Sequence, residues 1–423
     1  MRYLAEYAWI DGRAQPDVLI EIAGGRFTRV EPGASEPATR LRGMVLPGLA
    51  NVHSHAFHRA LRGRTQGMRG SFWTWRELMY KVAGRLDPDG YFRLARAVYG
   101  EMALAGITGV GEFHYLHHRP DGRPYDDPNA MGEAVIAAAR EAGLRITLLD
   151  TLYLHSSVDG RALHGVQRRF GDGTREHWRQ RVAELRPGEG VRIGAAYHSV
   201  RAVSPEALQP VDGPLHVHLS EQREENESCL AVHGCTPTEL LRREGVLGRN
   251  TTVVHATHLT DDDVHTLGGT GTGVCLCPTT ERDLADGIGR ARALAHSGSR
   301  LSLGSDSHAV IDLFEEARGM EMHERLCSEQ RGHFTPEELL AAATRHSALG
   351  WDDAGRIAVG RRADLVAVRT DGVRTAGAEP AQIVLAATAA DVTDVIADGR
   401  PVVSEGRHTS FDVAAALREA VAW

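Results

Sequence analysis

The chain has 423 residues and a formal net charge of −8, and 42% of its residues are hydrophobic and 25% charged. This composition is typical of a globular protein and excludes a disordered chain, while the length suits two or three domains of about 150 residues or one α/β barrel with additions. No apolar run reaches about 18 residues and no basic stripe is present, so we expect neither a membrane nor nucleic acid as a partner.

The beginning of the chain and its cysteines both favour a cytoplasmic location. The first residues, MRYLAEYAWIDGR, contain an acid and a turn where a signal peptide needs an apolar core. The five cysteines are an odd number and are scattered, which does not suit a disulfide framework. Cys275 and Cys277 lie two apart in GVCLCPTT, and we interpret them as buried core thiols in preference to a CxC metal site.

Both ends of the chain have the pattern of short β-strands. Residues 1–45 alternate short apolar stretches with Gly and Asp-Gly turns. Residues 353–423 repeat this pattern and then end in a helix. We expect the two ends to pair into one small β-sandwich domain beside a central piece, residues 46–352.

The central piece alternates apolar strand segments with segments of helical composition. Strands that alternate with helices form parallel sheets, and eight repeats predict a (β/α)8 barrel. The loop after the first strand, residues 58–88, is long enough to act as a lid that excludes water. The predicted strand segments are residues 45–55, 107–118, 144–155, 191–201, 214–221, 251–259, 273–280 and 301–308.

Nearly every predicted strand ends in ionisable residues. In a barrel of this kind the carboxyl ends of all strands meet on one face, where the active site forms. A chain with 22 histidines places some of them at strand ends by chance, but not readily at almost every one. We therefore expect an active site at this face, with His114, His117, His118, His155 and His308 around its mouth.

The end of the first strand, NVHSHAFH, gives the clearest indication of a metal site. His53 and His55 are two residues apart, so both side chains point to the same side of the strand. His218 ends the fifth strand and Asp306 ends the eighth. Three neutral imidazoles and one carboxylate suit zinc, with an open position for water.

These motifs resemble those of the amidohydrolase superfamily over essentially the whole chain. The resemblance rests on HSH after the first strand, HxxE after the fifth, a histidine after the sixth and an aspartate after the eighth, between two β-rich ends. It implies that the catalytic metal is bound by His53, His55, His218 and Asp306.

The number of metal ions follows from the same resemblance. Binuclear members of the superfamily use a carboxylated lysine on the fourth strand as a bridge, whereas the single lysine of this chain is Lys81, far from that strand. We therefore expect one divalent ion per chain, with Zn²⁺ as the first choice and Fe(II), Mn(II) and Ni(II) also compatible with the ligands. Mononuclear members with HxxE after the fifth strand are mostly deaminases.

Longer motifs resemble one family within this superfamily, the formimidoylglutamate deiminases of bacterial histidine degradation. They are HSHAFHRAL, SFWTWRELMYK, EFHYLHH, HSVRAV, HLSEQREENESCLA and GSDSHAVIDLFEEAR. The resemblance implies hydrolysis of N-formimidoyl-L-glutamate to N-formyl-L-glutamate and ammonia.

The expected chemistry assigns three catalytic residues. Water activated by a divalent ion attacks the sp² formimidoyl carbon near neutral pH. Asp306 can accept a proton of that water, and His255 can hold the water in place. Glu221, three residues after His218, can carry a proton to the departing nitrogen. The alternative for Glu221 is a surface residue that opens the acidic helix EQREENE.

The expected substrate carries two carboxylates, and bidentate binding of carboxylates is typical of Arg. The resemblance selects Arg76 in FWTWR and Arg201 in HSVR as clamps, with Tyr115 and His198 as hydrogen-bonding partners. The same resemblance puts His58 near the substrate, at a position where the family has Gln. Any other Arg of this Arg-rich chain is expected on the solvated surface.

Three other interpretations stay open from the sequence. A deaminase of a guanidino acid or of a cyclic substrate such as guanine would use the same metal ligands. A hydrolase that releases formamide and glutamate would use the same substrate. A non-enzymatic scaffold would be expected to lack some ligands, whereas this chain keeps the whole set. We expect a small dicarboxylate substrate and a homodimer.

Overall fold

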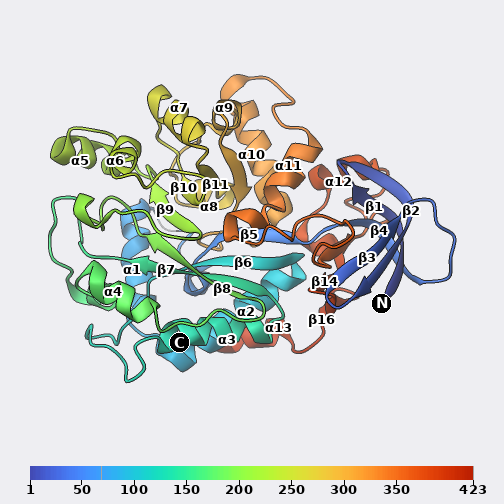
Figure 1. Cartoon of the computed structure of the whole chain (residues 1–423), viewed down its shortest axis with the longest axis horizontal. Coiled ribbons are helices and arrows are strands. Elements are labelled where there is room, and N and C mark those ends of the chain that lie inside the picture. Colours follow the sequence, from blue (N-terminus) through green and yellow to red (C-terminus); the bar gives the residue numbers. More distant parts are fainter. Residues whose placement is uncertain (68, 423) are drawn as a thin grey trace.

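The computed structural model describes residues 1–67 and 69–422 and contains two eight-stranded sheets (Figure 1). The first sheet is entirely parallel, and neighbouring strands follow one another in the chain. A parallel bridge between Ser54 and Asp306 connects the ends of its first and last strands. The predicted (β/α)8 barrel is therefore confirmed. Its strands are β5 (Leu49–Ser54), β6 (Ile107–His114), β7 (Arg145–Leu152), β8 (Val191–Tyr197), β9 (Leu215–Leu219), β10 (Thr251–His255), β11 (Gly273–Leu276) and β12 (Arg300–Leu303).

The first predicted strand segment is divided between the two sheets. Residues 45–47 belong to β4 (Thr39–Pro47), and only the part after Gly48 enters the barrel. Gly48 permits the change because a Cβ at this position would collide with the side chain of Thr108. The barrel strands are buried over nearly their whole length, as expected of parallel strands that are covered on both faces.

Helices connect the barrel strands and cover the outside of the sheet (Figure 1). In α2, Asp87 accepts a hydrogen bond from the Gly90 N–H at 2.7 Å and Pro88 occupies the first turn, so both signals fix where the helix begins. The helices of the central piece are α1 (Phe72–Ala83), α2 (Pro88–Leu104), α3 (Ala130–Glu141), α4 (Arg175–Val182), α5 (Arg223–His233), α6 (Pro237–Arg243), α7 (Asp261–Thr270), α8 (Pro278–Asp283), α9 (Ala291–Ser297), α10 (Leu313–Ser328) and α11 (Pro336–Ala343).

The second sheet combines strands from both ends of the chain, as predicted. Its order is β16-β15-β14-β13-β4-β1-β2-β3, and the antiparallel pair β13–β4 joins the two halves. Alternating buried residues such as Val18, Ile20 and Ile22 form its own core. The remaining strands are β1 (Arg2–Ile10), β2 (Arg13–Ala23), β3 (Arg26–Glu31), β13 (Leu365–Val368), β14 (Val392–Ala397), β15 (Arg400–Ser404) and β16 (Arg407–His408).

A buried ion pair and a helix packing are among the contacts that attach the C-terminal segment to the barrel. Arg145 on β7 binds Asp364 beside β13 through both terminal nitrogens, and both side chains are 1% exposed. After α12 (Ile383–Ala386) and the last strands, α13 (Val413–Ala420) packs on α2, where Gly100 makes room for Phe411 and Val413.

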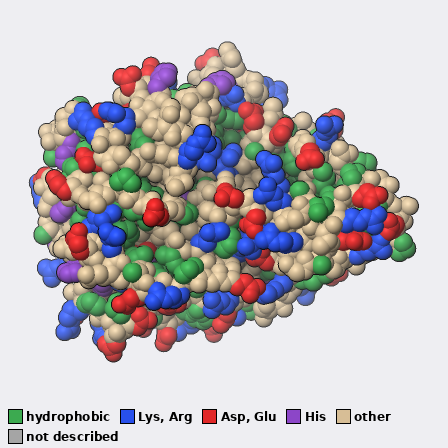
Figure 2. All heavy atoms as spheres, viewed as in Figure 1, with side chains coloured by type: hydrophobic (Ala, Val, Ile, Leu, Met, Phe, Trp, Pro, Cys, Tyr) green, Lys and Arg blue, Asp and Glu red, His purple; other side chains and the backbone are tan. Residues whose placement is uncertain are grey.

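The surface carries charges of both signs. Figure 2 shows basic and acidic side chains interspersed over the face that it draws. Among the described residues, no helix is long and apolar enough to cross a membrane.

Candidate active site

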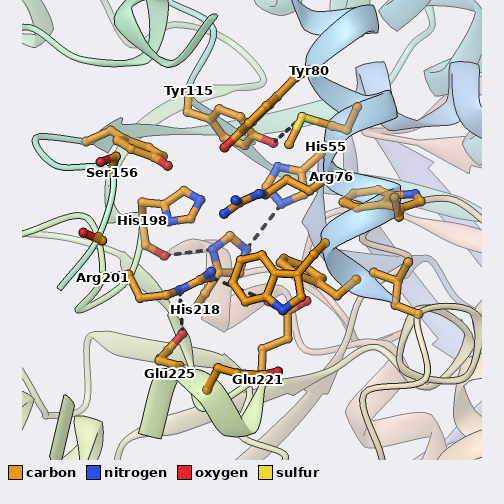
Figure 3. A pocket seen from close by; sticks show the side chains of 18 of the residues that line it. His55, Arg76, Tyr80, Tyr115, Ser156, His198, Arg201, His218, Glu221 and Glu225 are labelled. Atoms are coloured by element: carbon orange, nitrogen blue, oxygen red, sulfur yellow. Dashed lines mark hydrogen bonds and ion pairs between the residues drawn. The ribbon is translucent and has the colours of Figure 1, made fainter. Parts of the chain in front are cut away.

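A cavity of about 290 Å³ lies at the carboxyl ends of the barrel strands (Figure 3). Residues at or just after the ends of seven barrel strands, all except β11, line it, and α1 supplies one wall. Of the residues predicted to bind the metal or substrate or to carry protons, His53 is the one outside this lining, because it is fully buried against His218 and Asp306. The predicted residues that do line it are His55, His58, Arg76, Tyr115, His198, Arg201, His218, Glu221, His255 and Asp306.

The four predicted metal ligands come together in one cluster. His218 Nε2 lies 3.1 Å from His53 Nε2 and 3.3 Å from His55 Nε2. One oxygen of Asp306 lies 3.2 Å from His53 Nε2 and 3.4 Å from His55 Nε2. Ligand bonds of about 2.0–2.1 Å in a tetrahedral zinc site separate neighbouring ligand atoms by about 3.3 Å. The cluster therefore has the size that such an ion requires.

Backbone carbonyls fix the tautomers of two of these imidazoles. His55 Nδ1 donates to the carbonyl of Phe113 at 2.9 Å, and His218 Nδ1 donates to the carbonyl of His198 at 2.8 Å. Each Nε2 then carries a lone pair, and the two lone pairs face each other in a buried space. Because they repel unless a cation lies between them, the donor set fits a bound metal ion.

The ionisation of the cluster suits the same role. Burial lowers the pKa of His53 and His218 below the ordinary value and lowers the pKa of His55 to about 3. Burial works against the charge of Asp306, but the hydrogen bond with His53 and the neighbouring imidazoles hold its pKa well below the usual range. Neutral imidazoles and an ionised carboxylate are the forms that bind metals.

Glu221 and His255 lie beside this cluster, after β9 and at the end of β10. His255 Nε2 is 3.7 Å from Glu221 and 3.9 Å from Asp306, and its Nδ1 is 3.5 Å from Glu281. Burial raises the pKa of Glu221. Burial disfavours protonated His255, yet the carboxylates of Glu221 and Glu281 raise its pKa well above the ordinary value. The pair can hold a proton at the edge of the metal cluster.

Arg76 extends from α1 into the cavity (Figure 3). Its guanidinium lies 4.4 Å from the ring centre of Trp73 and 5.5 Å from that of Tyr80. The Nε atom is buried and has no hydrogen-bond partner among the described residues. A cation placed in this way in a cavity favours an anionic ligand.

Arg201 lies on the opposite side of the cavity, after β8. Its Nε is 3.0 Å from a carboxylate oxygen of Glu225, and its Nη2 is 3.9 Å from Glu221. Burial opposes the charge, but Glu225 and Glu221 raise the pKa of Arg201 above its ordinary value. Arg201 is therefore charged and fixed in direction.

Three further predicted residues gather between the arginines and the metal cluster. His58 Nε2 and the hydroxyl of Tyr115 are hydrogen-bonded at 2.9 Å. The ring of His198 lies 5.8 Å from that of Tyr115, and His198 Nδ1 contacts the Ser199 hydroxyl at 3.1 Å. Burial and the neighbouring His55 lower the pKa of His58 well below the ordinary value, so His58 is a neutral hydrogen-bonding group.

The other histidines at strand ends do not line the cavity, and the prediction for them is wrong. They are His114, His117, His118, His155 and His308. Their side chains find other partners: His117 Nε2 donates to the carbonyl of Thr151 at 2.9 Å, and His118 Nε2 lies 3.0 Å from Asp172. Position at a strand end alone did not indicate which way these rings turn.

One group among them has the spacing of a metal site. Suitable atoms of His114, His117 and Asp150 lie within 4.8 Å of one another. Arg181, however, donates to both oxygens of Asp150 at 2.8 Å, and Trp178 Nε1 donates to one of them at 2.9 Å. This cation already neutralises the carboxylate, so the group forms a buried ion-paired network.

Sequence reasoning missed two buried carboxylates, Glu225, which lines the cavity, and Glu281, which lies 3.5 Å from His255. Glu225 falls four residues after Glu221, and this helical spacing was an available signal. Glu281 follows a strand whose Cys275 and Cys277 are free and buried, as expected of core thiols. No spacing within the chain connects Glu281 with His255, because His255 ends β10 and Glu281 lies on α8.

Comparisons with known proteins agree with this architecture. The chain matches the model described as the amidohydrolase family over residues 44–402. It is 37% identical to formimidoylglutamate deiminase of Pseudomonas aeruginosa over 91% of this chain and 90% of that protein. It is 28% identical to 8-oxoguanine deaminase of the same organism over 96% of this chain and 91% of that protein. The solved structure of an amidohydrolase from Brucella melitensis has a TM-score of 0.88 and 33% identity, covering 99% of this chain and 98% of that one.

The chain belongs to the amidohydrolase family and is a hydrolytic deaminase of that family. Within the family, its motifs and its identity over most of its length relate it to formimidoylglutamate deiminase. The resemblance that the motifs predicted is thus confirmed, together with the fold.

Proposed function

We propose that the enzyme hydrolyses N-formimidoyl-L-glutamate to N-formyl-L-glutamate and ammonia, a step of histidine degradation. One observation carries the proposal: Arg76 and Arg201 lie in the same cavity of about 290 Å³ as the metal-ligand cluster. A substrate with two carboxylates and one amidine carbon offers a partner to each of these groups.

The metal would be held by His53, His55, His218 and Asp306, with Zn²⁺ as the first choice. When bound, such an ion makes a water nucleophile available near neutral pH. Asp306 lies where it can accept the first proton of this water, and His255, 3.9 Å from Asp306, can hold the water in place. The remaining tasks, proton transfer and binding of the substrate carboxylates, are assigned to side chains of the protein.

Proton transfer determines which group leaves. The water oxygen forms a bond to the formimidoyl carbon, and the terminal nitrogen must gain two protons before the carbon–nitrogen bond breaks and ammonia departs. Both protons come from the attacking water. Glu221, whose pKa is raised by burial, can take a proton near the cluster and deliver it to this nitrogen.

The carboxylates would be bound by the two arginines. Arg76 has no carboxylate partner for its buried Nε, and Arg201 retains its terminal nitrogens beyond the ion pair with Glu225. Tyr115, His198 and His58 would complete the hydrogen bonds around the substrate. The neutral imidazole of His58 can supply one N–H, as the amide of a Gln would at this position.

A deaminase of a cyclic amidine, such as a nucleobase, is the second candidate. The 28% identity to 8-oxoguanine deaminase and the aromatic wall of Phe72, Trp73 and Tyr80 favour it. Two guanidinium groups in the lining of the cavity disfavour it, because a neutral base leaves them without a partner.

A substrate panel distinguishes these candidates. We expect the metal-loaded enzyme to release ammonia from N-formimidoyl-L-glutamate with a kcat/KM at least about 100-fold above those for guanidino acids and nucleobases, since each unpaired arginine costs roughly 2–5 kcal/mol. A preference for a nucleobase would contradict the proposal.

A further inference from the structure

Glu225 on α5 contacts both the loop after β8 and the turn after β9, two segments that form the cavity. It is 1% exposed, in the first turn of α5. One carboxylate oxygen accepts a hydrogen bond from the Ser220 N–H at 3.0 Å, and the other lies 3.0 Å from Arg201 Nε (Figure 3). Ser220 has a left-handed backbone, with φ of 49°, and directly precedes Glu221. Glu225 therefore ties the loop after β8 to the turn after β9.

Arg201 has a second carboxylate within reach. Its Nη2 lies 3.9 Å from Glu221, which is too far for a hydrogen bond but near enough for a small rotation to form one. In such a pair, the substrate-binding Arg201 and the proton carrier Glu221 would bind each other instead of acting on the substrate. The ion pair between Arg201 Nε and Glu225 opposes this rotation and leaves the terminal nitrogens of Arg201 to the cavity.

We propose that Glu225 is a positioning residue that directs Arg201 toward the substrate and keeps it from pairing with Glu221. This inference rests on the proposed function, in which Arg201 binds a carboxylate and Glu221 carries a proton. It predicts that the effect of Glu225 on substrate binding operates through Arg201 and disappears when Arg201 is absent. A residue that only supports the fold would act equally in both cases.

A double-mutant cycle tests this coupling in the full-length, metal-loaded enzyme. The variants are Glu225→Ala, Arg201→Met and the double variant, with Glu227→Gln on the exposed side of α5 as the control. The readouts are kcat and KM for N-formimidoyl-L-glutamate and, independently of turnover, the calorimetric Kd for N-formyl-L-glutamate. We expect Glu225→Ala to raise KM and Kd by about tenfold or more and to lower kcat as well. In the Arg201→Met background the same change should move KM and Kd by less than about threefold.

Conservative variants keep the test decisive if Glu225→Ala does not fold. Glu225→Gln retains an acceptor at the same reach, whereas Glu225→Asp retains the charge but is one methylene shorter. We expect Gln to stay within about threefold of the parent in KM and Asp to be worse than Gln. The reverse order, an unchanged KM in Glu225→Ala, or equal losses in both backgrounds would overturn the inference. A parent enzyme that neither turns over N-formimidoyl-L-glutamate nor binds its product would show that the proposed function itself is wrong.

Discussion

Glu221 is surrounded differently from Asp306, although both carboxylates border the metal cluster. Imidazoles hold Asp306 ionised, whereas burial raises the pKa of Glu221. We expect Glu221→Gln, which keeps the shape but cannot carry the proton, to retain the metal and to lower kcat by about 10²–10⁴-fold. Elemental analysis and ammonia release measure these two effects, and Glu227→Gln is the control. Turnover near that of the parent would place the proton carrier elsewhere.

Arg76 lines the cavity, and its Nε lacks a hydrogen-bond partner and a nearby carboxylate in the described chain. We expect Arg76→Met to lower kcat/KM for N-formimidoyl-L-glutamate by about 30-fold or more, mainly through KM, because a substrate carboxylate loses its partner in a desolvated site. Steady-state kinetics provide the measurement. Arg85→Met, an exposed arginine just after α1, should leave both constants unchanged. Equal kinetics for the two variants would show that Arg76 contributes no more to substrate binding than a solvated arginine.

At the scale of elements, the metal cluster depends on the close approach of β12 and β5. A Cβ added at Gly304 would lie 2.7 Å from His53 Cβ and 2.9 Å from its backbone nitrogen. We expect Gly304→Ala to push the strands apart, to destabilise the protein by about 1–3 kcal/mol and to reduce metal retention on dialysis. Metal content and thermal unfolding test this. Gly248→Ala, which has no atom within 4 Å of the added Cβ, is the matched control, and full metal retention in Gly304→Ala would contradict the argument.

The elements also explain which parts of the site could be predicted. The metal ligands lie at or just beyond the ends of parallel strands, so topology alone brings His53, His218 and Asp306 to one face. Glu225 could not be assigned in this way, since its role depends on a contact with a loop more than twenty residues earlier in the chain. The predicted loop of residues 58–88 contains α1, and the helix rather than the loop directs Arg76 into the cavity.

At the scale of the molecule, the buried pair of Arg145 and Asp364 connects the barrel to the second sheet. Burial opposes the charge of Asp364, but Arg145 holds its pKa below the usual value. A lowered pKa contributes stability above the unfolded-state value of about 3.9, and this contribution is lost as the pH falls through the lower value of the folded state. We therefore expect Asp364→Asn to lower the free energy of unfolding by about 3–5 kcal/mol at pH 7.

The pH dependence provides the check on this prediction. The difference between Asp364→Asn and the parent should shrink when urea unfolding is repeated below about pH 4, because the parent then loses the same contribution. Asp371→Asn, at an exposed pair with Arg369, should behave like the parent at both pH values. A difference that is the same at pH 7 and in acid would show that the charge of Asp364 does not stabilise the fold.

The architecture of the chain could be predicted from the sequence more completely than its oligomeric state. Alternating strands and helices predicted the barrel, and turn-rich ends predicted the second sheet, because both are local patterns. The pairing of β13 with β4 joins residues more than 300 apart, and no local pattern specifies it. The homodimer and the cytoplasmic location stay predictions.

The identity of the products tests the central claim most directly. N-formimidoyl-L-glutamate labelled with ¹³C at the formimidoyl carbon should be followed by NMR during turnover by the metal-loaded enzyme. The account predicts that the labelled carbon appears in N-formyl-L-glutamate, with one equivalent of ammonia released and with loss of the reaction after metal removal. Labelled formamide together with glutamate, or an unchanged substrate in the presence of bound metal, would contradict it.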